Sequence, residues 1–472
     1  RMARGDESLL AGERGLGPAT PRARVTHFMS HPTESVRLLS VRSAVWSTGG
    51  MLAANALRLA GNVAVAWLLA PEVFGLMVLV NVFMQGVNQL AAANVGTAVV
   101  QNPRGEEPSF LNTAWTLQII RGAAVAGVAV VGAPLYAWAY SKPELAPLIM
   151  FTALNLLLSG LRPMGFPLSR KRMALGRNTL VGIAGQFVGI VVMVAVAYVH
   201  RSVWALAAGP VATGLVTTGL GYLLLPKHRH RLRWDRGAVR EIFRFMRWIV
   251  LSSWLTFFAL SADRLILGAL ISESKLGVFG IALGMAEIVR QVSQKLQSSV
   301  VFPAVSKRQH LPRHELRRKL IDARRKPLFA CAIGLALLVA FGDLIFVVLY
   351  DQRYVEAGWM FRVLAGGMWL ILALGMVRPA LGAVGHPEYS TLAYALRLVV
   401  VLPGVYFGYQ HFGMPGAVAA VALSDLPTYF GFAIGLKRQG LLTLGQDALA
   451  TATFIGVTAS LMALRFAISG TW

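Results

Sequence analysis

The sequence predicts an all-α polytopic membrane protein built from two six-helix lobes, plus about one extra C-terminal helix. The first observation is composition: 56% of the 472 residues are hydrophobic and only 14% are charged, whereas a soluble domain has about 25% charged residues. The second is that the apolar residues gather in runs long enough to cross the hydrocarbon core of a bilayer. The third is the uneven placement of lysine and arginine between successive runs.

We expect thirteen apolar segments to form membrane helices, and the loops between them are short. The last segment follows Gly440 and begins beside Gly445 and Asp447, so it either spans the membrane or lies partly in the interface. The segments are 44–69, 75–101, 112–139, 144–161, 178–199, 203–225, 247–271, 276–304, 327–350, 357–384, 390–410, 414–436 and 446–468.

Lysine and arginine set the expected orientation. Of the 45 such residues, 32 lie in the tail and loops on the N-terminal side of the membrane and 4 lie in the opposite loops. Because cytoplasmic loops carry the excess of positive charge, the N-terminus is expected in the cytoplasm. The net charge of +24 is then a sign of topology, and no nucleic-acid partner is expected.

An internal repeat supports the two lobes. Gly75 and Gly277 occupy the same place in two similar turns, at an offset of 202 residues. Six helices per repeat is an even number, so the repeats are expected to be parallel, with an axis along the membrane normal. The expected division is a disordered basic cytoplasmic tail (1–42), an N-lobe (43–226), a basic cytoplasmic linker (227–246), a C-lobe (247–437) and an extra C-terminal segment (438–472).

Two polar stripes occupy the second helix of each repeat. They consist of Asn81, Gln85, Asn88 and Gln89 in the first lobe and of Glu287, Arg290, Gln291 and Gln294 in the second. The members of each stripe fall on one helical face. Lipid cannot satisfy such side chains, so the stripes either face a central wet cavity or join packed helices through hydrogen bonds.

Charges also lie inside the expected spans, and the balance is cationic. A charge at bilayer depth costs about 2.5 to 3.5 kcal/mol to insert, so such residues should face a partner or a cavity. Surplus cations suit an anionic ligand, since arginine matches phosphate oxygens, and the amides suit sugar hydroxyls. The cations are Arg58, Arg121, Arg264, Arg290, Lys295, Arg362, Arg378, Arg397 and Arg465, and the carboxylates are Asp263, Glu287, Asp343 and Asp425.

Several of these charges also have simpler explanations. Arg121, Arg397 and Arg465 could extend their side chains to the interface. Glu287 and Arg290 are three residues apart on one helix and could neutralise each other. The alternatives remain open at this point.

Enzymatic chemistry and metal binding are not expected. The single cysteine, Cys331, lies in an apolar run and the histidines do not converge at ligand spacing, so no metal site and no cofactor are expected. There is no GxxxxGK[ST] loop for a nucleotide phosphate. The outer loops are too short to carry a catalytic domain.

Several ordered motifs resemble a known family. The runs DRLILG (263–268), LGVFGIA (276–282) and FPAVS (302–306), with weaker motifs at 71–76 and 354–357, are similar to Wzx-type oligosaccharide flippases. These are polysaccharide biosynthesis proteins of the multidrug/oligosaccharidyl-lipid/polysaccharide exporter superfamily. The resemblance covers about residues 40 to 440. The long basic tail and the thirteenth segment depart from the family pattern.

The resemblance implies a V-shaped pair of lobes in the bacterial inner membrane. It implies that they move an undecaprenyl-diphosphate-linked oligosaccharide by alternating access, for exopolysaccharide or lipopolysaccharide biosynthesis. Helices one, two, seven and eight would line the cavity. The expected partners are this lipid-linked glycan, membrane lipids, a coupling proton or sodium ion, and other polysaccharide assembly proteins.

Residue roles follow from combining the resemblance with the stripes and charges. The diphosphate is expected on Arg58, Arg264, Arg290 and Lys295, and the sugars on Asn81, Gln85, Asn88, Gln291 and Gln294. Asp263 and Glu287 are the candidates for proton or cation coupling. The alternatives are a cation-coupled multidrug or small-molecule antiporter, a membrane glycosyltransferase or ligase, and a scaffold that transports nothing.

Overall fold

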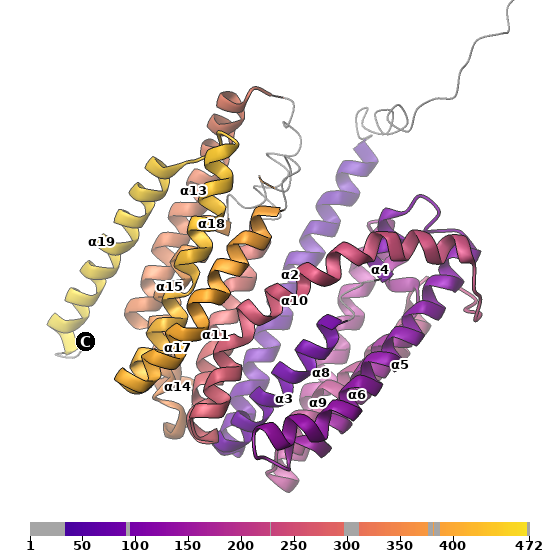
Figure 1. Cartoon of the computed structure of the whole chain (residues 1–472), viewed down its shortest axis with the longest axis horizontal. Helices are drawn as coiled ribbons and strands as arrows, with labels where there is room; N and C mark the ends of the chain where they lie inside the picture. The colour runs from indigo at the N-terminus through magenta and orange to yellow at the C-terminus, as the bar shows by residue number, and fades with distance from the viewer. Residues whose placement is uncertain are drawn as a thin grey trace, which may run out of the picture.

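The protein is a bundle of long helices (Figure 1). The computed structural model describes residues 34–90, 95–226, 228–296, 311–375, 381 and 388–469. Within these ranges the regular structure is α-helical apart from one short 3-10 turn, and no strand occurs. The expected all-α membrane architecture is therefore confirmed.

The first group of helices, which we call the N-terminal lobe, comprises α2 to α9. Within it α8 packs against both α2 and α9, α6 packs against α5 and α9, and the short α4 and α7 lie against each other. The bounds are α2 (Glu34–Leu68), α3 (Pro71–Leu90), α4 (Val95–Gln101), α5 (Pro108–Ala139), α6 (Leu145–Gly160), α7 (Gly165–Lys171), α8 (Leu175–His200) and α9 (Trp204–Leu224).

The second group, the C-terminal lobe, comprises α10 to α19. Here α17 packs against α10 and α18, while α15 packs against α11, α13 and α17, and α19 covers α13 from outside (Figure 1). The bounds are α10 (Arg236–Leu270), α11 (Glu273–Leu296), α13 (Arg313–Phe341), α14 (Leu344–Leu349), the 3-10 turn η2 (Gln352–Tyr354), α15 (Ala357–Gly375), α17 (Glu388–Leu423), α18 (Asp425–Arg438) and α19 (Leu444–Ser469).

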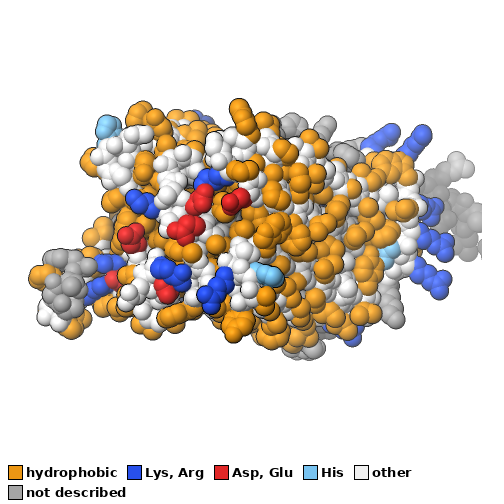
Figure 2. Space-filling model, turned by 90° about the horizontal axis from the view of Figure 1, so that it is seen from below, with side chains coloured by type: hydrophobic (Ala, Val, Ile, Leu, Met, Phe, Trp, Pro, Cys, Tyr) orange, Lys and Arg blue, Asp and Glu red, His pale blue; other side chains and the backbone are white. Residues whose placement is uncertain are grey.

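Chain direction alternates so that the two ends of the bundle differ in charge. The basic end carries the connections at 102–107, 161–174 and 226–235, and the opposite end carries those at 140–144 and 350–356. Seen from the opposite end, hydrophobic side chains cover most of the surface, and acidic and basic side chains gather on one part of it (Figure 2). Large apolar side chains remain exposed along the helices, as a lipid-facing surface requires.

The number of spans differs from the thirteen expected. In the described part of the chain, ten helices are long and apolar enough to cross a membrane, or eleven if α6 and α7, bent by 55°, form one span. Helix α13 does not count as a membrane span because its first half, residues 313–326, carries many charged side chains. The range Glu388–Arg438 counts once, although α17 consists of two helices that meet at a kink at Gly413, whose φ of 62° favours glycine. This kink agrees with the two segments expected at 390–410 and 414–436.

Two expected segment boundaries also shift. Helix α2 already begins at Glu34, so 34–42 are helical where a disordered tail was expected, and residues 1–33 lie outside the described ranges. Helix α10 begins at Arg236, so half of the expected linker is the first part of a 35-residue helix. The division into domains stays a prediction.

The lobes meet at the opposite end through α3 and α11, which start with similar turns. A Cβ on Gly75 would lie 2.0 Å from the carbonyl oxygen of Glu273, and one on Gly277 would lie 1.9 Å from that of Pro71. Each glycine is 202 residues from its counterpart, and so are the two carbonyls. This reciprocal pair is the contact expected of two helices related by a twofold axis, and it leaves no room for a larger residue.

Polar side chains add further contacts at this end. The Tyr140 hydroxyl donates to the Leu265 carbonyl at 2.9 Å, and the Lys142 ammonium lies 2.6 Å from a carboxylate oxygen of Glu273. The Tyr354 hydroxyl donates to the carbonyl of Leu69 at 2.8 Å. All three cross from one lobe to the other. The lobes are therefore joined at the end opposite the basic loops.

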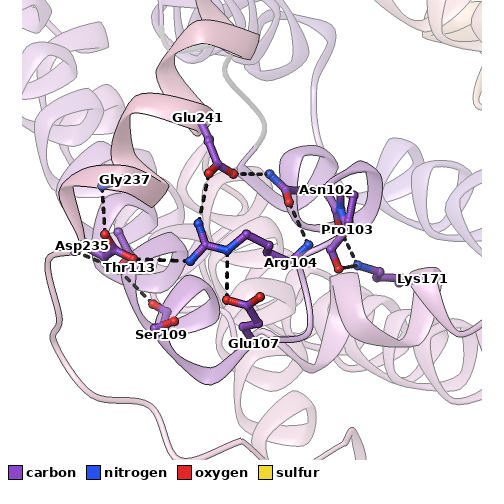
Figure 3. Close-up of polar contacts among 10 residues, drawn as sticks. All are labelled: Asn102, Pro103, Arg104, Glu107, Ser109, Thr113, Lys171, Asp235, Gly237 and Glu241. Atoms are coloured by element: carbon purple, nitrogen blue, oxygen red, sulfur yellow. Dashed lines mark hydrogen bonds and ion pairs between the residues drawn. The ribbon is translucent and has the colours of Figure 1, made fainter. Parts of the chain in front are cut away.

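Helix α10 also reaches the N-terminal lobe at the basic end (Figure 1). Its N-cap, Asp235, accepts a hydrogen bond from the amide of Gly237 at 2.8 Å. One turn later Glu241 pairs with Arg104 at 3.0 Å and accepts a hydrogen bond from Asn102 at 2.7 Å (Figure 3). The first turns of α10 are thus fixed to one lobe, while the rest of the helix packs mainly in the other.

Candidate functional site

A cavity of about 600 Å³ lies between the two lobes. Its lining comes from α2 and α3 on one side and from α10, α11, α15, α17 and α18 on the other. Nine of the eleven residues selected from the sequence line it, namely Arg58, Asn81, Gln85, Asp263, Arg264, Glu287, Arg290, Gln291 and Gln294. The structure therefore brings most of the expected site residues together. Their roles stay predictions.

The N-terminal wall of the cavity, formed by α2 and α3, carries few charges. Asn81 and Gln85 are four residues apart and project from the same face of α3 into the cavity. Arg58 is the single cation of this wall among the described residues, and it donates to the amide oxygen of Asn55 at 3.0 Å. Such a wall offers hydrogen bonds from neutral amides.

The C-terminal wall begins with two adjacent charges on α10. Asp263 is 4% exposed, and its carboxylate lies 3.8 Å from Nε of Arg264. The Arg264 guanidinium instead donates to the carbonyl of Leu260 at 2.9 Å and to the hydroxyl of Ser261 at 3.1 Å. The expectation that these two charges are poor partners for each other agrees with this geometry.

Helix α11 contributes the second polar stripe to the same wall. Nε of Arg290 lies 3.3 Å from the Glu287 carboxylate, one turn earlier. The Glu287 side chain is 45% exposed and that of Arg290 is 16% exposed, so solvent weakens this pair. The buried Nε atoms of Arg264 and Arg290 donate no hydrogen bond to any described residue. Both guanidinium groups therefore retain donors for a ligand.

Arg397 is the functional candidate that the sequence argument missed. It lines the cavity from α17 and is 3% exposed, so it does not extend to the interface as considered above. Nε donates to the carbonyl of Ala259 in α10 at 2.7 Å, and the guanidinium forms an ion pair with Asp425 at the start of α18. The only signal in the sequence was a charge inside an apolar segment, since its partners are far away along the chain.

Two selected residues lie outside the cavity lining. The Asn88 amide oxygen accepts a hydrogen bond from Arg121 at 3.0 Å in a separate small polar pocket, so Arg121 has a protein partner. Lys295 donates to the hydroxyl of Ser47 in α2 at 2.7 Å, which makes it a contact between the lobes. The stripe on α3 and the charges of α11 thus leave the cavity one turn earlier than expected.

The remaining buried charges are structural pairs. Arg465 holds the Asp343 carboxylate through two hydrogen bonds of 2.7 and 2.6 Å, so it does not extend to the interface either. Arg362 adds a longer contact of 3.8 Å to the same carboxylate. Arg378 lies outside the described residues. In the described ranges, no cluster of three His, Cys, Asp or Glu side chains could hold a metal ion.

Two histidines outside the spans are partly buried against the N-terminal lobe. Nε2 of His230 accepts a hydrogen bond from the amide of Met164 at 3.1 Å, and Nε2 of His228 lies 2.9 Å from the amide oxygen of Asn112. Burial lowers the pKa of His230, and neighbouring His228 lowers it further. Burial also lowers the pKa of His228. They fix the connection that leads into α10.

A family comparison gives a match to more than half of the chain. The family model described as "Polysaccharide biosynthesis protein" matches residues 64–358. A curated relative from Haloferax volcanii, "Probable low-salt glycan biosynthesis flippase Agl15", is 24% identical over 227 residues. That alignment covers 45% of this chain and 48% of the relative, so it spans about half the length of each.

Solved structures show the same fold. An inward-facing multidrug resistance MATE family transporter of the MOP superfamily aligns with a TM-score of 0.64 and 16% identity, over 81% of this chain and 94% of that one. Lipid II flippase MurJ in an inward closed conformation aligns with a TM-score of 0.63 and 10% identity, over 90% of this chain and 99% of that one. At these identities the likeness establishes the architecture alone.

Proposed function

The chain belongs to the polysaccharide biosynthesis protein family, and from this premise we propose that it is a flippase for a diphosphate-linked lipid oligosaccharide. The observation that carries the proposal is one cavity whose described lining holds four arginines and four neutral amides. Arginine side chains match phosphate oxygens in geometry and charge. Neutral amides can donate to and accept from sugar hydroxyls. A lipid diphosphate that carries a glycan needs both.

Transport by alternating access is supported by where the lobes touch. The contacts of Gly75, Gly277 and Lys142 close the end opposite the basic loops. Under the positive-inside orientation this end faces away from the cytoplasm, so these contacts would shut the cavity off from the outer side. Opening these contacts and closing the basic end would release the glycan on the other side. The bacterial inner membrane is the proposed location.

Energy coupling is part of the same proposal. Asp263 and Glu287 both line the cavity, so their protonation or occupation by a cation would change the charge that the substrate meets. A proton or a sodium ion is the proposed coupling ion. Membrane lipids and other polysaccharide assembly proteins remain proposed partners.

Translocation of a defined lipid-linked glycan in proteoliposomes tests the proposal. The fluorescent glycan is placed in one leaflet, and its arrival in the other is followed by loss of protection from a membrane-impermeant quencher. We expect Arg290→Ala to lower the rate roughly tenfold or more, the size expected for losing a hydrogen bond to a charged group, and Arg58→Ala to lower it less.

A matched control comes from the surface of the basic end. Arg172 is half exposed and pairs only with Glu106, so Arg172→Ala should leave the rate unchanged. Wild-type rates in both Arg290→Ala and Arg58→Ala would show that neither arginine binds the diphosphate.

A cation antiporter is the second candidate, because the cavity also holds buried carboxylates, Asp263 and Asp425. This function predicts export of a cationic dye that depends on those two residues. Dye transport without glycan translocation would favour it over the flippase.

A further inference from the structure

Arg397 joins three helices at the cavity wall. It belongs to α17, its Nε donates to the Ala259 carbonyl of α10 at 2.7 Å, and its guanidinium pairs with Asp425 of α18. The residue is 3% exposed and Asp425 is 6% exposed. Both residues nevertheless line the cavity, so a ligand inside can reach the pair.

The charged or titratable groups near this pair, among the described residues, lie on α10, α11 and α17. Arg290 of α11, Asp263 and Arg264 of α10 and the Tyr394 phenol of α17 all interact electrostatically with Arg397. On α18 the nearest polar neighbour of Asp425 that lines the cavity is the uncharged Thr428, and the lining residues of α15 are apolar or glycine. Arg397 and Asp425 thus form the most enclosed ion pair among the described lining residues.

The charge balance of the lining decides what an anion must do. The described lining holds four guanidinium groups and three carboxylates, so its net charge is +1. A diphosphate diester brings two negative charges. One negative charge is then left over beside the buried Arg397–Asp425 pair, where an uncompensated charge costs several kcal/mol. A proton from solvent would remove it.

We propose that Asp425 takes up this proton when a diphosphate diester binds to Arg397, so that substrate binding and protonation are one exchange. The proposal rests on the flippase function above. The incoming phosphoryl oxygens replace the Asp425 carboxylate as partners of the guanidinium. Asp425 then loses its counter-charge while still buried, and burial favours the neutral acid. The proton comes from the aqueous cavity, and no bond other than the new O–H forms or breaks.

The two other cavity carboxylates have less reason to be protonated. Glu287 is 45% exposed at its side chain, so water continues to solvate it. Asp263 is buried, but Arg264 stays beside it at 3.8 Å. Asp425 is the buried carboxylate that loses an ion-pair partner from another helix when the ligand binds Arg397. This places the exchange at α17 and α18, outside the two polar stripes.

Calorimetric titration of the purified full chain with geranyl-diphospho-N-acetylglucosamine tests the exchange. This probe is a diphosphate diester, so its own charge is constant between about pH 6 and 8. Titration in buffers of different ionisation enthalpy counts the protons taken up. We expect about one proton per ligand in the wild type and affinity that weakens about tenfold per pH unit as pH rises, as linkage of one proton requires.

Variants assign the proton to a residue. Asp425→Asn should bind with no proton uptake and no dependence on pH. Asp343→Asn, which alters an arginine-bound carboxylate outside the cavity lining, should still take up one proton.

The outcomes separate this inference from the proposed function. Binding without proton uptake by the wild type would overturn the exchange and leave the flippase function standing, and this result needs no variant to fold. Proton uptake that persists in Asp425→Asn would also overturn it. Absence of binding at every pH would overturn the proposed substrate and the exchange together.

Discussion

The two walls of the cavity are related by the internal repeat, yet they hold their polar groups in different ways. Asn81 and Gln85 on the N-terminal wall are neutral, and Arg58 beside them has a neutral partner in its own helix. The C-terminal wall carries three arginines and three carboxylates, and its pair Arg397–Asp425 joins separate helices. The repeat has kept the shape of the wall while its charges have gathered in one lobe.

This difference suggests a division of labour within one cavity. A wall whose charges are paired across helices changes its electrostatics whenever a ligand takes one member of a pair. A wall of amides binds through individually weak hydrogen bonds and tolerates variation in the ligand. On this account the arginines of the C-terminal lobe recognise the constant diphosphate, and the amides of both walls contact the glycan.

The largest effect is expected from removing a charge that joins helices in the C-terminal wall. Arg397→Ala would leave Asp425 buried without a partner, so we expect the free energy of unfolding to fall by about 3 to 5 kcal/mol. Arg58→Ala, in the other wall, removes a hydrogen bond to a neutral amide and should cost about 0.5 to 1.5 kcal/mol. Thermal and denaturant unfolding in detergent compares the two. Equal losses of unfolding free energy in the two variants would contradict the proposed difference between the walls.

Ligand affinity should show the same contrast with a smaller effect. For the diphosphate diester probe, Arg264→Ala and Arg290→Ala should each cost about 1.5 to 3 kcal/mol, roughly 10- to 150-fold in Kd. Asn81→Ala and Gln85→Ala should each cost about 0.5 to 1.5 kcal/mol, roughly 2- to 12-fold. Titration calorimetry measures all four. An amide variant that weakens binding as much as an arginine variant would contradict the assignment of the diphosphate.

The contact at the opposite end should, in contrast to the cavity, respond equally from both lobes. Gly75→Ala and Gly277→Ala each place a methyl group against a carbonyl oxygen, so each should disfavour the closed contact by about 1 to 3 kcal/mol. Distances between spin labels at Glu144 and Glu356, in a cysteine-free background, report the opening. Gly127→Ala is the control, since its added Cβ meets nothing within 4 Å.

An unequal response of the two glycine variants would show that the lobes are asymmetric here as well. Identical distances in both variants and the control would show that this contact does not hold the lobes together.

The smallest effect concerns the histidines of the N-terminal lobe. Burial lowers the pKa of His230, so the folded state favours its neutral form. Its stabilisation is therefore present above the ordinary pKa of about 6.5 and is lost as pH falls below it. His230→Phe keeps the ring beside Trp115 and Tyr222 and loses the acceptor for Met164.

We therefore expect the free energy of unfolding of His230→Phe to be about 0.5 to 1.5 kcal/mol lower than that of the wild type at pH 8. The difference should be smaller at pH 5.5. Melting curves at the two pH values measure it. A stability difference between variant and wild type that grows as the pH falls would contradict this pH dependence.

Much of the cavity followed from periodicity, because the helical repeat and the offset of 202 residues determine which side chains share a face. The positions of Gln85, Glu287 and Arg290 could be inferred in this way. Arg397 could not, because it is 138 residues from Ala259 and only packing brings them together. Lys295 was assigned to the cavity as a charge inside the span, but its side chain contacts Ser47 of α2, whereas the adjacent Gln294 lines the cavity. Spacing thus gives direction, whereas depth and partners depend on tertiary contacts.

The helical spans show the same limit. Apolar length located the helices and the break at Gly413, but it could not show that α13 would include a charged first half. That half depends on its neighbours, since Arg324 in α13 is fully buried against Asp447 of α19. Composition alone describes Arg324 as part of a basic loop.

The most direct test of the account is translocation of a lipid-linked oligosaccharide by the reconstituted protein, compared between Arg290→Ala and Gln85→Ala. These residues lie on opposite walls of the same cavity. The account predicts translocation by the wild type, a loss of roughly tenfold or more in Arg290→Ala, and a smaller loss in Gln85→Ala that varies with the glycan. Absence of translocation by the wild type, or wild-type rates in Arg290→Ala, would contradict it.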